Sequence, residues 1–193
     1  MRKLLIPLLA AIALPTAAIE QPLLFERKSN TATEILANTE IAQVKSAVFY
    51  YNRGNDKYAS GDYQGAIADY SKAIELNPSY AKAYNNRGIA KKNLRNYQGA
   101  ISDYSKAIEI NPSDADAYSN RGVAKRKLKD YYGAISDYSE AIELNPSFAA
   151  AYKNRSISKE IIGDIKGACV DAKKAVSLGD KASDNEIWIK ETC

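Results

Sequence analysis

Small and apolar residues between positions 81 and 112 follow the spacing of two consecutive α-helices. They are Ala83, Tyr84, Gly88, Ala90, Ala100, Ile101, Tyr104, Ala107 and Ile108. The steps between them put the first four on one face of a helix over residues 81–94 and the others on one face of a helix over residues 97–110. Such a hairpin cannot bury its apolar face alone, so it must stack on a neighbour. The pattern predicts an all-α fold.

This pattern recurs every 34 residues. Asn77, Asn111 and Asn145 each precede a proline at that spacing, and because the residue before proline avoids the helical region, each of them ends a second helix. Other columns of one residue type are Tyr50, Tyr84, Tyr118 and Tyr152; Asn52, Asn86, Asn120 and Asn154; Ala66, Ala100, Ala134 and Ala168; and Ala73, Ala107, Ala141 and Ala175. The expected N-caps of the second helices are Asp62, Asn96, Asp130 and Asp164. Self-similarity at this period indicates a helical repeat array.

The order of the columns resembles the tetratricopeptide repeat, with tyrosine at the fourth place, glycine at the eighth, alanine at the twentieth and twenty-seventh, and proline at the thirty-second. The resemblance covers about 135 of the 193 residues. It implies a right-handed superhelical solenoid of about four hairpins, over residues 47–80, 81–114, 115–148 and 149–182. The fourth is degenerate, with Ser156 at the glycine place and Ala172 at a tyrosine place, as expected of a terminal repeat with one face in solvent.

Glycine occurs in three settings in these repeats. Gly88 opposite Ala100 is expected to let the two helices of a hairpin approach closely, with Tyr104 filling a flanking gap. A glycine also lies in the first turn of every second helix, at Gly65, Gly99, Gly133 and Gly167. There it is unfavourable by up to about 1 kcal/mol relative to alanine, and either close packing or a recent duplication explains it. In the turn between helices, Arg95 and Lys129 replace glycine, which leaves the turn conformation open.

Segments on both sides of the repeats are expected to shield the ends of the solenoid. Residues 19–46 are interpreted as a leader followed by an N-terminal capping helix, because Thr31 and Glu34 have the spacing of a capping box. The alternative is a partly disordered tail. Residues 183–193 are interpreted as a C-terminal capping helix on the same grounds, with Ser183 and Glu186 as the capping box.

Residues 1–18 have the layout of a secretory signal peptide. Arg2 and Lys3 precede an almost wholly apolar run from Leu4 to Leu14, and small residues follow it. The alternative is an uncleaved anchor, but about 15 apolar residues interrupted by prolines fall short of the roughly 20 that span a bilayer. The chain is therefore expected to be exported and cleaved, with the mature protein in a bacterial periplasm, in a lumen or secreted, and without stable membrane insertion.

Composition argues against catalysis and against nucleic acid as a partner. The chain contains no histidine, which removes the commonest general base and metal ligand, so no metal and no cofactor is expected. The aspartates Asp69, Asp103, Asp137 and Asp171 recur once per repeat and are interpreted as periodic surface residues. Loss of residues 1–18 leaves 25 of the 27 basic residues against 23 acidic ones, which gives no basic excess for nucleic acid.

A binding surface remains as the functional prediction. In tetratricopeptide arrays the first helices of successive hairpins line a concave groove, and the resemblance places the following residues there: Asn52, Asn55, Asn86, Ile89, Lys92, Asn120, Val123, Arg126, Lys127 and Asn154. This predicts a protein–protein interaction module, an adaptor or assembly factor that holds an extended segment of a partner protein. The alternative is a structural or self-associating repeat protein with an unused groove. The oligomeric state stays open.

The asparagine column has two interpretations. It is similar to the asparagine ladder in the repeats of O-linked N-acetylglucosamine transferase, where the amides would pair with a peptide backbone. The other interpretation is that asparagine at this place satisfies local backbone groups. The carboxylate clamp of chaperone-binding arrays is matched only in part, since Asn55 and Asn86 fit but Tyr51, Asp116 and Asn120 do not, and a C-terminal carboxylate ligand of that type is disfavoured.

The two cysteines, Cys169 and Cys193, are the only ones in the chain. An exported protein meets an oxidising compartment, and a closing helix folded back across the last hairpin would bring Cys193 towards Cys169. A disulfide between them is predicted. The alternative is that Cys169 is a small core residue and Cys193 a free thiol.

Overall fold

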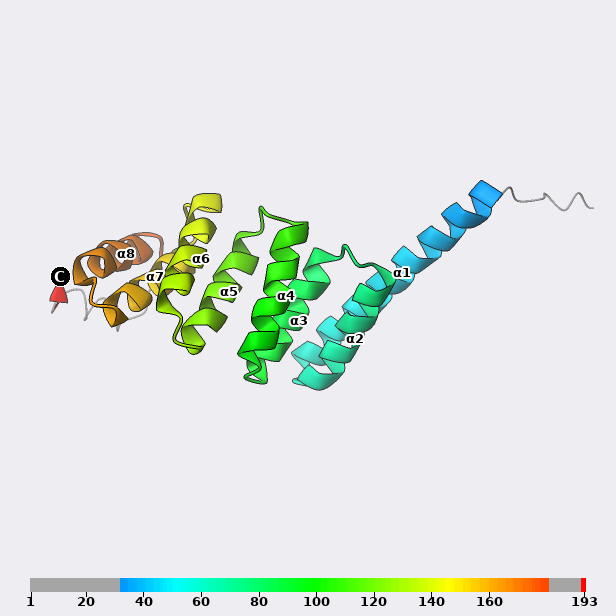
Figure 1. The fold of residues 1–193 in the computed structure, drawn as a ribbon, viewed down its shortest axis with the longest axis horizontal. Coiled ribbons are helices and arrows are strands. Elements are labelled where there is room, and N and C mark those ends of the chain that lie inside the picture. Colours follow the sequence, from blue (N-terminus) through cyan, green and yellow to red (C-terminus); the bar gives the residue numbers. More distant parts are fainter. Residues whose placement is uncertain (1–31, 181–191) are drawn as a thin grey trace, which may run out of the picture.

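The computed structural model describes residues 32–180 and 192–193, and residues 32–180 form eight α-helices (Figure 1). They are α1 (Ala32–Ala59), α2 (Tyr63–Leu76), α3 (Ala81–Asn93), α4 (Tyr97–Ile110), α5 (Ala115–Lys127), α6 (Tyr131–Leu144), α7 (Ala149–Ile161) and α8 (Ile165–Ser177). Each odd-numbered helix packs on the even-numbered helix that follows it, and each even-numbered helix packs on the next hairpin. The predicted all-α solenoid of stacked hairpins is confirmed for this part of the chain.

The N-terminal part of the fold differs from the prediction. A separate capping helix that covers the first repeat is wrong, because α1 runs without a break from Ala32 to Ala59 and its first half projects from the stack (Figure 1). Neither glycine nor proline occurs between residues 32 and 53, so nothing in the sequence ends the helix there. Ala47 is the first buried residue of α1. Residues 1–31, and with them the predicted signal peptide and leader, lie outside the described residues.

The interior of each hairpin consists of alanine and tyrosine. The eighth-place glycine contacts a tyrosine ring of the second helix, and not the alanine that the sequence analysis placed opposite it. A Cβ atom built on Gly88 would lie 2.7 Å from Cε1 of Tyr104, which is too close for a real contact. Gly54 and Gly122 are related to Tyr70 and Tyr138 in the same way. The glycine is therefore needed as a seat for a fully buried tyrosine.

The first-turn glycines of the second helices have a different role. Gly133 donates its backbone N–H to Oδ1 of Asp130, the N-cap of α6, at 2.9 Å, and the same bond is made in α2, α4 and α8. The capping carboxylate occupies the space into which a Cβ atom on Gly133 would project. These glycines thus make room for the cap, an explanation that the sequence analysis did not reach.

The turn inside each hairpin keeps one backbone conformation despite its changing residue. Gly61 and Gly163 have φ angles of 83° and 86°, and Arg95 and Lys129 at the same place have 60° and 66°. All four lie in the left-handed region, which is strained for side chains other than glycine. The turn conformation that the sequence left open is therefore the same in all four repeats.

The periodic aspartates are buried, so their interpretation as surface residues is wrong. Asp69, Asp103, Asp137 and Asp171 are between 1% and 4% exposed. Each accepts two hydrogen bonds from an arginine of the preceding helix, as Asp103 does from Nε and Nη2 of Arg87 at 2.9 and 2.7 Å. A lysine completes each pair, such as Lys91 at 2.8 Å from Asp103. Burial is possible because these cations neutralise each carboxylate.

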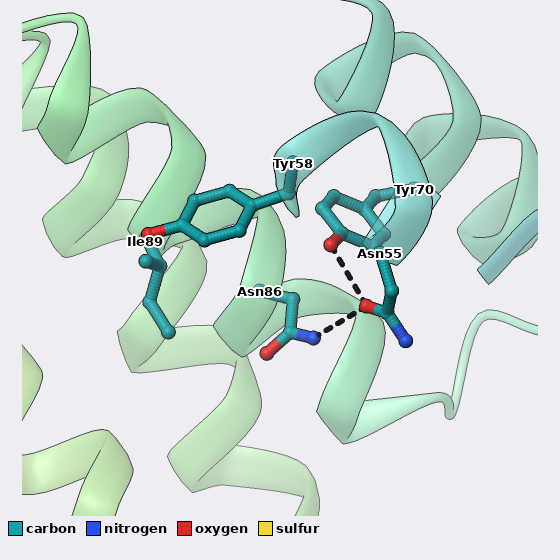
Figure 2. Close-up of a pocket in the computed structure, with 5 residues that line it drawn as sticks. All are labelled: Asn55, Tyr58, Tyr70, Asn86 and Ile89. Atoms are coloured by element: carbon teal, nitrogen blue, oxygen red, sulfur yellow. Dashed lines mark hydrogen bonds between the residues drawn. The ribbon is translucent and has the colours of Figure 1, made fainter. Parts of the chain in front are cut away.

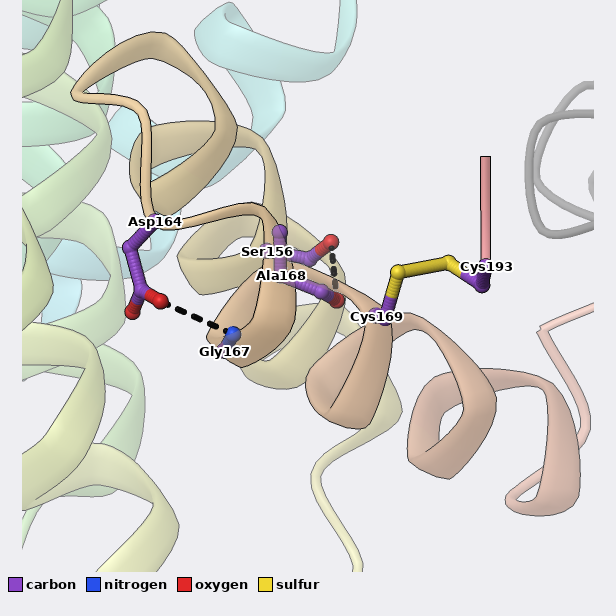
Figure 3. The surroundings of a disulfide bond; sticks show 6 residues. All are labelled: Ser156, Asp164, Gly167, Ala168, Cys169 and Cys193. Atoms are coloured by element: carbon purple, nitrogen blue, oxygen red, sulfur yellow. Dashed lines mark hydrogen bonds between the residues drawn. A yellow bond between two sulfur atoms is a disulfide. The ribbon is translucent and has the colours of Figure 1, made fainter. Parts of the chain in front are cut away.

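The last hairpin replaces the glycine–tyrosine contact with another arrangement (Figure 3). Ser156 is buried and donates its hydroxyl to the carbonyl oxygen of Ala168 at 2.9 Å. Cys169 is joined to Cys193 by a disulfide, with a Cα–Cα distance of 5.7 Å. The predicted C-terminal capping helix falls on residues 183–193, most of which lie outside the described residues. Among the helices described here, none is both long and apolar enough to cross a membrane.

Candidate peptide-binding groove

The first helices of the hairpins, α1, α3, α5 and α7, lie next to one another along one side of the stack. Three hydrogen bonds between their side chains join residues 35 positions apart. The amide of Asn86 donates to the hydroxyl of Tyr51 at 3.1 Å, that of Asn93 to Tyr58 at 2.8 Å, and that of Asn120 to Asn85 at 3.3 Å. A side chain on one first helix therefore meets the side chain 35 residues later on the next. We call the surface formed by these four helices the groove.

A cavity of about 100 Å³ lies in the groove between α1 and α3 (Figure 2). Its lining residues are Asn55, Tyr58, Tyr70, Asn86 and Ile89. Oδ1 of Asn55 accepts two hydrogen bonds, from the hydroxyl of Tyr70 at 2.8 Å and from the amide of Asn86 at 3.0 Å. Burial raises the pKa of Tyr70 to about 12, so its hydroxyl stays protonated and can donate this bond. The cavity presents aromatic and aliphatic surface beside amide groups.

A wider and more open cleft of about 530 Å³ lies at the other end of the same helices. Its lining includes Tyr51, Lys82, Asn85, Asn86 and Asp116, which come from α1, α3 and α5. Asn86 lines both spaces and so connects the small cavity to the cleft. Amides and opposite charges dominate this part of the groove, which suits hydrogen bonding to a peptide backbone.

Tyr104 and Tyr138 occupy the place of Tyr70 in the second and third repeats, and their surroundings differ. Asn55, which accepts the hydroxyl of Tyr70, is replaced 34 and 68 residues later by Ile89 and Val123, which cannot accept a hydrogen bond. Within the described residues the hydroxyls of Tyr104 and Tyr138 are buried and unpartnered. Burial raises the pKa of Tyr104 and raises that of Tyr138 to about 12.

Cations lie in the groove at the place that Tyr58 occupies in the first repeat. Lys92 and Arg126 follow Tyr58 at steps of 34 residues and are half-buried, and Lys127 beside them is exposed. Burial lowers the pKa of Lys92. Nε of Arg126 is buried and has no hydrogen-bond partner among the described residues. The middle of the groove therefore carries positive charge.

The structure brings some of the sequence-predicted site residues together and separates others. Asn55, Asn86 and Ile89 line one cavity. Asn120, Val123, Lys92, Arg126 and Lys127 continue the row along α3 and α5. Asn52 is exposed on α1 and lines neither the cavity nor the cleft. Asn154 lies half-buried on α7.

Tyr70 is the cavity residue that the sequence analysis missed. It belongs to a second helix, whose residues were assigned to the interior of the hairpin, and it reaches the groove because Gly54 leaves space for its ring. A signal was present, since Asn55 is the single polar residue in a column that continues with Ile89, Val123 and Ile157. A polar residue at an otherwise aliphatic place indicates a polar neighbour.

Comparison with known protein families decides the kind of repeat. The family profile described as "TPR repeat" matches residues 54–94, and the profile described as "Tetratricopeptide repeat" matches residues 81–114 and 115–148. The chain carries tetratricopeptide repeats. No curated protein matches it.

Solved tetratricopeptide repeat structures agree with this fold. The first repeat domain of Spaghetti (RPAP3), solved with the HSP90 peptide SRMEEVD bound, is 28% identical and covers 62% of this chain and 94% of that chain, with a TM-score of 0.61. The OM64 domain of Arabidopsis is also 28% identical, covers 62% and 98% of the two chains and has the same TM-score. A crystal structure of MamA is 26% identical, covers 75% and 85%, and has a TM-score of 0.68.

The tetratricopeptide repeat is generally a protein-interaction scaffold without catalytic activity, and the groove geometry agrees with that. Its polar groups are amides, hydroxyls and cations spread over four helices, and the carboxylates of the repeats are engaged by arginine and lysine. Groups of three or more carboxylates or cysteines that could hold a metal ion are absent from the described residues. This arrangement binds, and it offers no paired acid and base for a reaction.

Proposed function

We propose that this protein is an adaptor or assembly factor that holds an extended segment of a partner protein in the groove. The observation that carries the proposal is the continuous groove itself, in which amides, aromatic rings and aliphatic side chains from α1 and α3 surround the cavity and the adjoining cleft. A related domain, that of Spaghetti (RPAP3), was solved with a peptide bound. Amides that offer a donor and an acceptor suit a peptide backbone of any sequence.

We propose in addition that the protein acts after export, in a periplasm or lumen or outside the cell. The basic and apolar pattern of residues 1–18 supports this, and the disulfide between Cys169 and Cys193 is a bond that persists in oxidising compartments. Intact-mass measurement of protein recovered from the exporting cell tests it. The mass should correspond to a chain that begins at or near Ile19, and recovery of residues 1–18 on a membrane-bound species would contradict export.

Site-directed photo-crosslinking tests the proposed partner binding. A photoreactive residue at Ile89, in the cavity, should crosslink to one partner protein in the native compartment, and the site in the partner should map to a single extended segment. The same residue placed at Lys173, exposed on α8 away from the groove, is the matched control. Equal crosslinking from both positions would contradict a groove-bound partner.

The structure also favours a second candidate, self-association through the projecting half of α1. Every side chain described between residues 32 and 46 is exposed, including Leu36 at 70% and Ile41 at 52%. Ile41, Val44 and Val48 are separated by three and four residues, the spacing of a helix-pairing stripe. A half-helix without packing partners is marginal alone. Sedimentation of the wild type and of Ile41→Glu/Val44→Glu tests it, and a monomeric wild type rejects it.

A further inference from the structure

We propose that the middle of the groove, at Lys92, Arg126 and Lys127, binds a glutamate or aspartate side chain of the partner segment. The inference rests on the proposed peptide-binding function and adds the chemistry of the partner. It makes the partner an acidic segment that passes through the groove, with a carboxylate held between α3 and α5.

The first argument is how the chain treats its other partly buried cations. The arginine of each first helix, Arg53, Arg87, Arg121 and Arg155, has a buried aspartate of the next helix within 2.6 to 2.8 Å. Lysines one turn later share the same carboxylates. Lys92 and Arg126 depart from this rule, since neither forms an ion pair within the described residues. Their charges are left for a group from outside the array.

The second argument is the burial of these two side chains. Nε of Arg126 is buried without an acceptor, and the neighbouring hydroxyl of Tyr138 is buried and unpartnered as well. A buried donor without an acceptor carries a desolvation penalty that a bound carboxylate would remove. The Lys92 ammonium is half-buried and its pKa is lowered, so a nearby negative charge would stabilise it too.

The third argument is the placement of Lys127 relative to Lys92. Side chains 35 residues apart meet across the groove, as Tyr58 and Asn93 do at 2.8 Å. Lys92 and Lys127 have the same separation and the same two places in the repeat. Two ammonium groups therefore face each other across the α3–α5 boundary, and an anion between them relieves their repulsion.

The position of the cluster identifies the source of the carboxylate as a side chain and not a chain end. The groove continues on both sides of α3 and α5, over α1 and over α7, so a segment bound at the middle runs on in both directions. Aliphatic Ile89 and Val123 lie one turn before Lys92 and Arg126 on the same helices. An acidic residue next to an aliphatic one matches this surface. Asp116 and Glu160 are the acidic residues of the neighbouring groove places, and they limit the positive region to its middle.

Fluorescence anisotropy with synthetic peptides tests the inference. The probe is a fluorescein-labelled peptide of glutamate–leucine pairs separated by glycine, with an amidated C-terminus. Its matched control has glutamine in place of every glutamate, and a third peptide is this glutamine version with a free C-terminal carboxylate. At about 50 mM salt, where screening is weak, the glutamate peptide should bind at least about tenfold more tightly than either of the others.

Variants of the protein assign the effect to the cluster. Lys92→Gln and Arg126→Gln should each weaken binding of the glutamate peptide by about fivefold and leave the glutamine peptide unchanged. Both should melt like the wild type, because neither cation is ion-paired within the array. Lys173→Gln on α8 removes the same charge outside the groove and should change nothing.

Three results would overturn the inference. They are equal binding of the glutamate and glutamine peptides, unchanged binding by Lys92→Gln and Arg126→Gln, and a preference for the peptide with the free C-terminal carboxylate. Each leaves the proposed function standing, since that is tested separately by crosslinking from Ile89. A single crosslinked segment that lacks acidic residues would support the proposed function and reject the acidic partner.

Discussion

Arginine at the seventh place of each repeat makes the largest number of specific contacts of any residue in the fold. Arg87 donates to both carboxylate oxygens of Asp103, donates to the hydroxyl of Ser71 at 3.0 Å, and lies over the ring of Tyr84 at 5.4 Å. Asp103 belongs to the second helix of the same hairpin, and Ser71 belongs to the preceding hairpin. One side chain thus joins three helices, and a conservative change to lysine would lose the paired geometry.

Acid should weaken the first of these arginine–aspartate pairs in a defined pH range. Hydrogen bonding from Arg53 holds the pKa of Asp69 at about 2, below its ordinary value of 3.8. Because the ionised form is favoured in the folded state, its contribution to stability is complete above the ordinary value and is lost as the pH falls towards 2. The melting temperature of the wild type should exceed that of Asp69→Asn at neutral pH, and the gap should close by about pH 2. A gap that stays constant on acidification would contradict this.

The N-cap aspartates and the first-turn glycines should behave as coupled pairs. Gly133→Ala should destabilise the protein by about 1 kcal/mol although alanine is the better helix former, because its Cβ would displace the capping carboxylate of Asp130. Asp130→Ala removes the cap, and adding Gly133→Ala to it should then restore part of the loss. Chemical denaturation of the two single variants and the double variant measures this coupling. Additive effects would show that the glycine has another role.

Asn86 serves the array as well as the groove, so its two interpretations can be separated by stability. Its amide donates to Tyr51 and to Asn55, which ties α3 to α1. Asn86→Ala should lower the free energy of unfolding by about 1 to 2 kcal/mol. Asn154→Ala, at the same place of the last repeat, should have a smaller effect. Equal stability of Asn86→Ala and the wild type would instead favour a role in ligand binding alone.

Hairpins are the elements of this fold, and the last one shows how far their interior can vary. In the first three, a glycine on the first helix receives a tyrosine ring from the second. In the last, Ala172 stands at the tyrosine place and is buried, and Ser156 fills the glycine place with a hydroxyl that reaches the carbonyl of Ala168. The two substitutions compensate for each other, because a smaller residue on one helix allows a larger one on the other.

Exchange of these two residues tests the compensation. Ala172→Tyr alone should destabilise the last hairpin by roughly 1 to 3 kcal/mol through overpacking against Ser156. The double variant Ser156→Gly/Ala172→Tyr should recover this loss, because it recreates the contact that Gly88 and Tyr104 make. Thermal unfolding of all three proteins decides it. If Ala172→Tyr is as stable as the wild type, the tyrosine place in α8 does not face Ser156.

The sequence predicted the elements well where the residues that define an element lie close together in it. Asp130 and Gly133 mark the start of α6, and Asn145 before proline marks its end. The projecting half of α1 was not predicted, because a capping-box pattern near residue 31 indicates a helix start and says nothing about where that helix packs. Continuity of α1 through residue 46 follows from the absence of a breaker, which is a weaker signal than a turn motif.

At the scale of the whole molecule, periodicity predicted the solenoid because each repeat contacts only its neighbours. It also placed Asn55, Asn86 and Ile89 in the groove. It could not predict that Asp103 is buried, since the arginine that neutralises it lies 16 residues away on another helix. Nor could it distinguish the paired cation Lys91 from the unpaired Lys92, which are adjacent in sequence. Such differences depend on where a side chain points, and a column of residue types does not contain that.

The C-terminal end of the molecule provides the last prediction, which concerns the disulfide. The last hairpin has a neighbour on one side only, α6, so its second helix is the least supported of the four. A bond between Cys169 and Cys193, 24 residues apart, restricts the unfolded chain by about 3 to 3.5 kcal/mol on the loop-entropy estimate. Cys193→Ser should therefore lower the melting temperature.

Hydrogen exchange should show where this loss occurs. In Cys193→Ser, exchange should accelerate in α7 and α8 and stay unchanged in α3 and α4, because a repeat array transmits little beyond the nearest neighbour. Cys169→Ser is the matched variant and should give the same pattern, and the double variant should add nothing. Thiol titration of wild-type protein from the oxidising compartment, under denaturing and non-reducing conditions, should find no free thiol. Two free thiols there would reject the bond, and the two serine variants would then match the wild type in both stability and exchange.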